Sequence, residues 1–411
     1  MDQNDKEIDE EQFKKEFEER VDKRKQWLLE ELKSCGKFLD VSAKKLDDLD
    51  ALTIALYLHE CQTELAVFHI GANSITDRGF IDMLTGLQWH DKLKEIYIGN
   101  NEITEIGIQG LIEISSCFKQ LKILSMSSCS IDDATFIQLC YALPELKNLQ
   151  QLQLPANNIS DYGNEMTILI GLVCFSTLLA TNSLPNLTVV HFGNNPLTSK
   201  SLVPFFQALK KNKTIKILYL NDIGMELASI KQLAVCLKKN KTLEDLNLGN
   251  TGFSDSAASV LWPSLKYLKK LQLWNNHLTD KAIDEFINVL EREDIGLTYV
   301  GLQDNEIEEL DLVEDLNALL KQNELIDKLT EQIEHKEEME EPDEDKQVKQ
   351  MIELAKLEEI EEKLGELEKL NEPSEEQQDV VNELQGKLKT QKWAGEIEDP
   401  EDKTLKHSVM E

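Results

Sequence analysis

The chain of 411 residues has 77 acidic and 44 basic residues, which gives a formal net charge of −33 at pH 7. Its length suffices for a large core or a repeat array, and 41% of the residues are hydrophobic, as in folded proteins. Such an acidic chain is not expected to bind nucleic acid, because phosphate groups repel it. The charge is uneven, since residues 311–411 contain 32 acidic and 13 basic residues.

The sequence predicts a cytoplasmic protein. Its seven cysteines are scattered and form no CxxC pair, which favours reduced thiols. The first ten residues, "MDQNDKEIDE", are too acidic for a signal peptide or a mitochondrial presequence. The longest apolar run begins at Met166 and is too short to span a bilayer, so no contact with a membrane is predicted.

Two segments precede the most regular part of the chain. Residues 1–36 predict an acidic, amphipathic helical arm, because apolar residues fall mainly at spacings of four in a charged background. These residues are Phe13, Phe17, Val21, Leu28 and Leu32. Residues 37–62 contain apolar residues without a repeat signature and predict an N-terminal cap.

Residues 63–309 contain nine copies of the pattern Lxx-L-x-L-xx-N-x-I/L, most of them 28 residues apart. A fixed period of this length indicates a solenoid. The copies begin at Leu65, Leu93, Leu121, Leu149, Leu187, Ile215, Leu243, Leu268 and Leu297.

This pattern resembles the leucine-rich repeats of the ribonuclease-inhibitor-like class, whose units are a short strand followed by a helix. The resemblance implies an α/β fold: a leucine-rich repeat solenoid with a curved parallel sheet inside, helices outside and flanking α-helical segments. The ninth position suits Asn, which would hydrogen-bond to the backbone of the turn. It is held by Asn73, Asn101, Asn157, Asn195, Asn276 and Asn305, and by Cys129. Ile223 and Thr251 depart from the pattern and predict two irregular turns.

Two helical segments follow the repeats. Residues 310–340 predict a C-terminal capping helix, and residues 341–411 predict an acidic helical tail that Pro373 interrupts. The heptads of the tail are short and irregular for a coiled coil. Two interpretations remain open, a solvated helix pair or helices that bind another protein with Trp393 as an anchor.

The inner face of the predicted sheet is the candidate binding surface, because alternate strand residues point out of a sheet. The third, fifth and seventh positions of nine repeats give 27 such residues, of which only Glu95, Asp245 and Lys270 are charged. The candidate partner-binding residues are His69, Tyr97, Gln153, His191, Tyr219, Asn247, Trp274 and Tyr299. Glycines at the seventh position would let a ligand backbone approach. The alternative is that these residues serve only strand packing.

A second candidate surface is a basic edge. The phrase "LKKNKT" occurs at Leu209 and again at Leu237, at the predicted ends of two helices. Its lysines are Lys210, Lys211, Lys213, Lys238, Lys239 and Lys241. They either complement the helix dipoles or hold an acidic segment, which is the chain's own tail or a partner protein.

No enzyme is predicted. The sequence has no P-loop, HExxH, GxSxG or dinucleotide motif, and the lone His69 and His191 indicate surface residues rather than a metal site, so no cofactor is expected.

The favoured function is a non-catalytic scaffold for protein–protein interaction. Its concave face would bind a partner segment and its acidic tail a second partner, within a large multi-subunit assembly. Similarity to axonemal leucine-rich repeat proteins implies a place in the cytoskeleton or the cilium axoneme.

Two alternatives are weighed. A GTPase-activating protein of the Ran-activator type is disfavoured, because the Phe-Thr-Gly-Arg stretch of that family is absent. An inhibitor of a basic enzyme, like ribonuclease inhibitor, would have more cysteine and an acidic groove.

Overall fold

The computed structural model describes residues 26–60, 64–161, 171–292 and 295–339, with side chains up to residue 328. It divides the chain into two compact units, residues 1–320 and residues 321–411. Phe13, Phe17 and Val21 of the predicted arm, and the whole acidic tail with Trp393, lie outside the described residues.

The first unit contains one sheet of ten parallel strands, which follow one another in chain order. Each strand is three residues long, and nine of them lie in the nine predicted repeats. The predicted α/β leucine-rich repeat solenoid is therefore confirmed. The strands are β1 (Phe38–Asp40), β2 (Val67–His69), β3 (Glu95–Tyr97), β4 (Ile123–Ser125), β5 (Gln151–Gln153), β6 (Val189–His191), β7 (Ile217–Tyr219), β8 (Asp245–Asn247), β9 (Lys270–Gln272) and β10 (Tyr299–Gly301).

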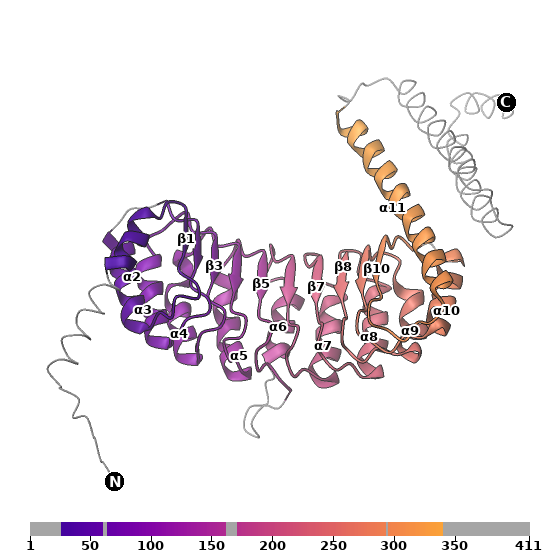
Figure 1. Cartoon of the computed structure of the whole chain (residues 1–411), viewed down its shortest axis with the longest axis horizontal. Coiled ribbons are helices and arrows are strands. Elements are labelled where there is room, and N and C mark those ends of the chain that lie inside the picture. Colours follow the sequence, from indigo (N-terminus) through magenta and orange to yellow (C-terminus); the bar gives the residue numbers. More distant parts are fainter. Residues whose placement is uncertain (1–25, 61–63, 162–170, 293–294, 340–411) are drawn as a thin grey trace, which may run out of the picture. The chain divides into compact units, whose positions relative to one another are not determined.

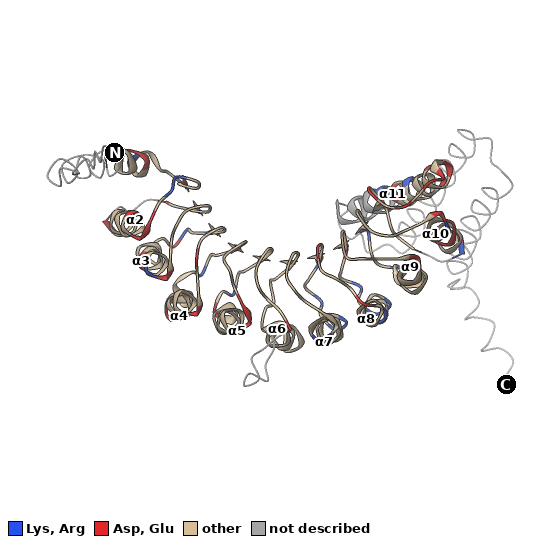
Figure 2. Ribbon diagram, turned by 60° about the horizontal axis from the view of Figure 1, so that its bottom comes forward, with Lys and Arg blue, Asp and Glu red and all other residues tan. Residues whose placement is uncertain are grey.

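A helix follows each strand, and α2 to α10 lie on the outer side of the arc, so that the sheet forms the inner face (Figures 1 and 2). The helices are α2 (Asp48–Glu60), α3 (Asp77–Leu87), α4 (Glu105–Ile114), α5 (Asp133–Ala142), α6 (Gly171–Ala180), α7 (Ser199–Leu209), α8 (Leu227–Leu237), α9 (Asp255–Leu261), α10 (Asp280–Arg292) and α11 (Leu310–Met339). Short 3-10 turns extend α4, α5 and α9.

The residues assigned to the N-terminal cap contain β1 and α2, a strand and helix in the same order as in the repeats. β1 pairs in parallel with β2, with Phe38 opposite Val67. The repeat pattern did not predict this additional strand. Residues 26–34 are helical, and Leu28 and Leu32 in this segment are fully buried in the core.

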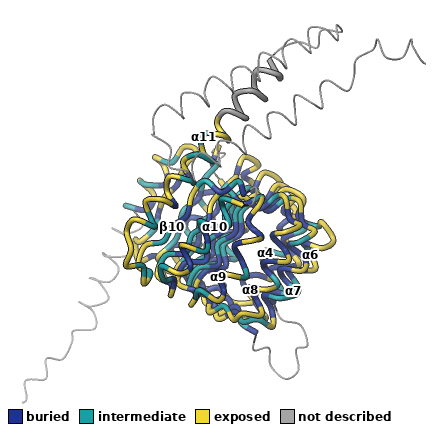
Figure 3. Tube along the Cα trace, turned by 90° about the vertical axis from the view of Figure 1, so that its right-hand side faces the viewer, coloured by how far each residue is buried: buried dark blue, intermediate teal, exposed yellow. Residues whose placement is uncertain are grey.

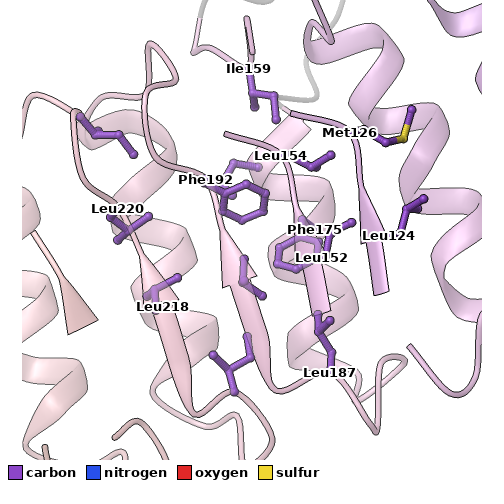
Figure 4. Packing of buried hydrophobic residues seen from close by; sticks show 14 of the residues in the cluster. Leu124, Met126, Leu152, Leu154, Ile159, Phe175, Leu187, Phe192, Leu218 and Leu220 are labelled. Carbon is purple, nitrogen blue, oxygen red and sulfur yellow. The ribbon is translucent and has the colours of Figure 1, made fainter. Parts of the chain in front are cut away.

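The core lies between the sheet and the helices, and buried residues run through the middle of the solenoid (Figure 3). Strand residues that alternate with the inner-face positions point toward the helices. Leu152, Leu154 and Phe192 are examples, and they pack around Phe175 of α6 (Figure 4). The rings of Phe175 and Phe192 meet edge to face at 5.2 Å between centroids. Because such interiors are close-packed, each repeat stabilises its neighbours.

The predicted asparagine ladder is present. Each of the six asparagines donates its Nδ2 to the carbonyl three residues earlier and to a carbonyl of the preceding repeat. For Asn101 these acceptors are Ile98 and Ile70, at 2.8 and 3.1 Å. Its Oδ1 also accepts a hydrogen bond from the Ile75 amide at 3.0 Å. The buried ladder therefore links consecutive turns.

The two departures from the ladder alter the turns less than predicted. Asp222 and Asn250, which precede Ile223 and Thr251, adopt the same positive φ as the corresponding residues of the other repeats. The path differs only after the turn, where the amide of Met225 donates to the Thr251 carbonyl at 3.0 Å. The entry into these two turns is thus regular, and the predicted irregularity is confined to the residues that follow, where Gly252 also has a positive φ of 71°.

At the C-terminal end, α11 begins at Leu310, and its Leu316 and Leu320 are buried. In the second unit, the described side chains belong to the same helix and include an ion pair between Glu324 and Lys328 at 2.7 Å. Among the helices of the described ranges, none has the length and apolar character that crossing a membrane requires.

Candidate functional site

The register of the sheet places the predicted inner-face residues in columns. His69, Tyr97, Gln153, His191, Tyr219 and Asn247 occupy the third residue of six strands, so they lie in one column across the sheet. Tyr299 lies in the neighbouring column, opposite Lys270, and Trp274 follows two residues after β9. The third, fifth and seventh positions of the nine repeats form three columns, which we call the inner strip. The structure therefore brings together most of the residues chosen from the sequence.

At its N-terminal end the inner strip carries a row of three neighbouring rings that are tilted against one another. The centroids of His69 and Tyr97 are 4.1 Å apart, and Phe38 lies 5.3 Å from His69 on the other side. Phe38 is 53% exposed and was missed, because it precedes the first recognised repeat. The sequence did contain an indication of a strand here, because apolar residues alternate in "FLDV" and Phe38 lies 29 residues before Val67, close to the repeat interval.

Tyr97 is held in its protonated form. Burial raises its pKa to about 12, and the hydrogen bond from its hydroxyl to Glu95, at 2.9 Å, acts in the same direction. The phenol orients one of the two carboxylates among the 27 positions.

A second group lies at the centre, around Tyr219. The ring of His191 is 5.0 Å from that of Tyr219, and burial lowers the pKa of His191 while the Asn221 carboxamide opposes the shift. Burial raises the pKa of Asp245, and Lys270 opposes this effect. Burial also raises the pKa of Tyr219. Burial thus disfavours the charged form of each of these groups.

Two polar atoms of this central group lack a partner. Nε2 of His191 and Oδ1 of Asp245 are buried and make no hydrogen bond of ordinary geometry among the described residues, although the Asn221 carboxamide is close enough to His191 to raise its pKa. They lie on β6 and β8, either side of Tyr219 on β7. His191 is therefore more buried than the surface residue that the sequence indicated.

The space beside the glycines of the inner strip is largely filled, which favours the packing alternative for them. A Cβ at Gly249 would overlap the indole of Trp274, which lies over this glycine. At Gly193 a Cβ would lie 2.7 Å from Oδ1 of Asn221, and at Gly71 it would lie 3.0 Å from the Gly99 carbonyl. The space beside each of these glycines is filled by neighbouring parts of the chain. This agrees with the alternative that residues at these positions serve strand packing.

The polar members of the strip are ordered by local hydrogen bonds. Gln153 donates to Oε1 of Gln151 at 3.3 Å, and Oδ1 of Asn247 accepts from the Gly249 amide at 2.9 Å. Tyr299 is 40% exposed and is the most accessible aromatic ring among the predicted candidates. The strip thus presents fixed polar groups between exposed rings.

The six predicted lysines of the basic edge follow α7 and α8. Lys210 and Lys238 are the C-cap residues of these helices. The asparagines between the lysines have a structural role that the sequence analysis missed. Asn240 donates to the Leu209 carbonyl at 2.6 Å, and Asn212 accepts from the Ile215 amide at 2.8 Å. The two asparagines occupy the same position in the two copies of "LKKNKT", and this repetition could have indicated the second ladder of hydrogen bonds.

Among the described residues there is no group of three His, Cys, Asp or Glu side chains that could hold a metal ion. No catalytic constellation was assigned from the sequence, and the geometry of the described part assembles none around His69 or His191.

No protein-family model matches the chain. It is similar to NACHT, LRR and PYD domains-containing protein 3 of Macaca mulatta and of Homo sapiens, at 25% identity over 273 residues in each case. These matches cover 65% of this chain and 25% of the relatives. It is also 30% identical over 130 residues to the ribonuclease inhibitor of Mus musculus, which covers 30% of this chain and 28% of the inhibitor. The chain thus spans about a quarter of the curated relatives it matches.

Two solved structures are similar at a low level. The actin-binding site 2 of leiomodin-1 has a TM-score of 0.38 at 22% identity, over 42% of this chain and 99% of that one. An internalin of Listeria monocytogenes has a TM-score of 0.35 at 18% identity, over 70% of this chain and 86% of that one. These scores are too low to support a conclusion about binding. The nine repeats, the parallel sheet and the similarity to ribonuclease inhibitor show that the chain has a leucine-rich repeat fold like that of the ribonuclease-inhibitor-like class.

Proposed function

We propose that the protein is a non-catalytic interaction scaffold whose inner strip binds an extended or helical segment of a partner protein. The observation that carries this proposal is the composition of the strip: three charged residues in 27 positions, in a chain that is 29% charged. A merely solvated face would carry more charge. Nine strands at nearly 5 Å each give a strip about 40 Å long, which suits a peptide segment.

The aromatic residues supply the anchors. Aromatic side chains are enriched among the residues that dominate binding energy, because they bury a large area at little entropic cost. Tyr219 and Tyr299 stand at the centre and at the C-terminal end of the strip. Phe38, with His69 and Tyr97, forms a third anchor at the other end.

The unpaired atoms around Tyr219 support a polar contact at the centre. Buried polar groups in proteins nearly always have partners, so His191 Nε2 and Asp245 Oδ1 call for an explanation. A bound segment that reaches these atoms would give each a hydrogen bond. The gain in binding free energy would be largest if the bound segment donates a hydrogen bond to Asp245.

The finer parts of the proposal concern the assembly. We propose that the acidic tail binds a second partner and that the protein belongs to a large multi-subunit complex in the cytoskeleton or cilium axoneme. The support is a resemblance, because axonemal proteins also combine leucine-rich repeats with charged helical tails. Microscopy of the tagged protein in ciliated cells tests the location. A diffuse signal with no axonemal enrichment would contradict it.

Affinity purification from the native source tests the inner strip. We expect Tyr219→Ala combined with Tyr299→Ala to lose the partners that the unmodified chain retains, because each anchor is worth about 2 kcal/mol, or roughly thirtyfold in affinity. The matched control is Tyr141→Ala, since Tyr141 is 61% exposed on the outer helix α5. Equal loss in the control, or full retention in the double variant with unchanged melting temperature, would contradict the proposal.

A further inference from the structure

The outer surface of α7 and α8 differs in charge from the rest of the solenoid. Neither helix contains an acidic residue, and α6 has none either, whereas α2 to α5 each contain at least one (Figure 2). Lys231 lies on α8, and the six lysines of the basic edge follow the two helices. In a chain with a net charge of −33, this concentration of lysine is unusual.

Helix dipoles do not explain the concentration. A basic residue after a helix complements the exposed carbonyls, and this applies to Lys210 and Lys238. If that were the whole reason, the other helices would end in the same way. The C-cap residues of α3, α4 and α5 are instead Gln88, Ser115 and Leu143. A lysine at the C-cap therefore distinguishes these two adjacent repeats from the three earlier ones.

The lysines also have little to do within the molecule. Lys210, Lys211, Lys213, Lys231, Lys238 and Lys239 make no ion pair in the part of the chain that the structure describes. Lys241 lies 5.3 Å from the ring centroid of Tyr267. The structural part of the twin phrase is the buried asparagine, and the side chains around it are left for solvent or for a partner.

Apolar residues lie among these charges. Leu227 and Val235 of α8 are 42% and 45% exposed. With Lys231 between them they follow one another at intervals of four, so these three residues share one face of the helix, and Lys239 follows its C-terminal end. The outer face of α8 is thus a stripe that alternates apolar and basic side chains.

We propose that this surface binds an acidic amphipathic helix of a partner protein. We define the basic outer surface as Leu227, Lys231 and Val235 with the six lysines of the basic edge. The partner's apolar side chains would cover Leu227 and Val235, and its carboxylates would pair with the lysines on either side. A nucleic acid is the poorer occupant, because it offers nothing to the apolar stripe and the whole chain repels a polyanion. The surface is separate from the inner strip, so the two proposals stand independently.

The test measures binding of the full chain to a fluorescent helical peptide of about 18 residues, with Leu on one face and Glu elsewhere, a length of roughly 27 Å. An isomer with scattered leucines serves as the peptide control. We expect Lys211→Glu with Lys239→Glu to weaken binding of the first peptide at least tenfold, and Val235→Ser to weaken it severalfold. The affinity should fall with added salt.

Lys119→Glu with Lys147→Glu is the matched protein control, because these exposed lysines occupy the Lys213 position in two earlier repeats. This control should bind normally, as should Tyr219→Ala, whose defect belongs to the inner strip. Equal binding of both peptides, or of polyphosphate, would overturn the proposal in favour of unspecific attraction. No binding at low salt, as expected if the chain's own tail occupies the surface, would overturn it as well.

Discussion

The imidazole of His191 and the phenol of Tyr219 lie on adjacent strands with their ring centroids 5.0 Å apart. Burial under this contact lowers the pKa of His191 below its ordinary value of 6.5. Tyr219→Ala should therefore return the pKa toward 6.5, whereas Tyr219→Phe, which keeps the ring, should leave it low. NMR titration of the imidazole signals, assigned with His191→Gln, measures this. An unchanged pKa of His191 in the Tyr219→Ala variant would refute the explanation.

The same shift makes stability depend on pH. Because the folded-state pKa of His191 is lowered, its contribution to stability is present above pH 6.5 and is lost as the pH falls through the folded-state value. Urea unfolding at pH 7.5 and pH 5.5 should show a smaller loss for His191→Gln than for the unmodified chain. Equal losses in the two proteins would mean that other groups dominate.

Asn240 tests the second ladder. Its Nδ2 donates to the carbonyls of Leu209 and Asn212, and its Oδ1 accepts from the amides of Thr242 and Leu243. Asn240→Ala leaves these backbone groups unpaired and should lower the free energy of unfolding by about 1–3 kcal/mol.

Lys239→Ala, in the adjacent position, is the control and should change the free energy of unfolding by less than about 0.5 kcal/mol. Denaturant unfolding measures both variants. A small effect of Asn240→Ala would show that water or a shifted backbone replaces the lost bonds.

Gly249 and Trp274 offer a test of packing on the inner strip. Gly249→Ala should lower the free energy of unfolding by about 1–3 kcal/mol, because the new methyl group overlaps the indole. In a chain with Trp274→Ala the same change should cost much less, giving a coupling of at least about 0.5 kcal/mol. Additive effects in this double-mutant cycle would show that the indole does not lie over Gly249 in solution.

The repeat pattern predicted the strands because it fixes two things at once. The buried leucines identify the strand and the side of it that packs against the helices, and the same place within the repeat puts Tyr97 and His191 in one column. β1 was missed because the segment around Phe38 lacks the leucine and the asparagine of the pattern, although its alternation is that of a strand. Pattern matching fails at the ends of a solenoid, where one side has no neighbouring repeat.

The site could be predicted only in part. The spacing of the repeats predicts the column in which a residue lies, but it does not predict which side chain fills the space beside it. The indole of Trp274 over Gly249 was therefore not foreseen. The unpaired atoms of His191 and Asp245 depend on side-chain orientation across three strands, and no sequence pattern encodes that. The asparagines of the twin phrase, by contrast, were visible in the sequence and were overlooked beside the lysines.

A pair of cysteines provides the last prediction. Cys140 of α5 and Cys174 of α6 interact across adjacent helices, and the thiol of Cys140 donates a hydrogen bond to Cys174. This bond lowers the pKa of Cys174 to about 7 against the opposing effect of burial, and it raises that of Cys140. Alkylation of Cys174 by iodoacetamide should therefore have a midpoint near pH 7, because the thiolate is the reactive form.

Cys140→Ala removes the donor, so the midpoint for Cys174 should rise toward the ordinary thiol value of 9 or beyond it, since only burial remains. Peptide mass spectrometry after timed alkylation measures the rate at each pH. Cys236→Ala is the matched control, because Cys236 is also buried but lies on α8, away from the pair. If Cys140→Ala leaves the midpoint unchanged while Cys236→Ala moves it, the hydrogen bond is not the cause.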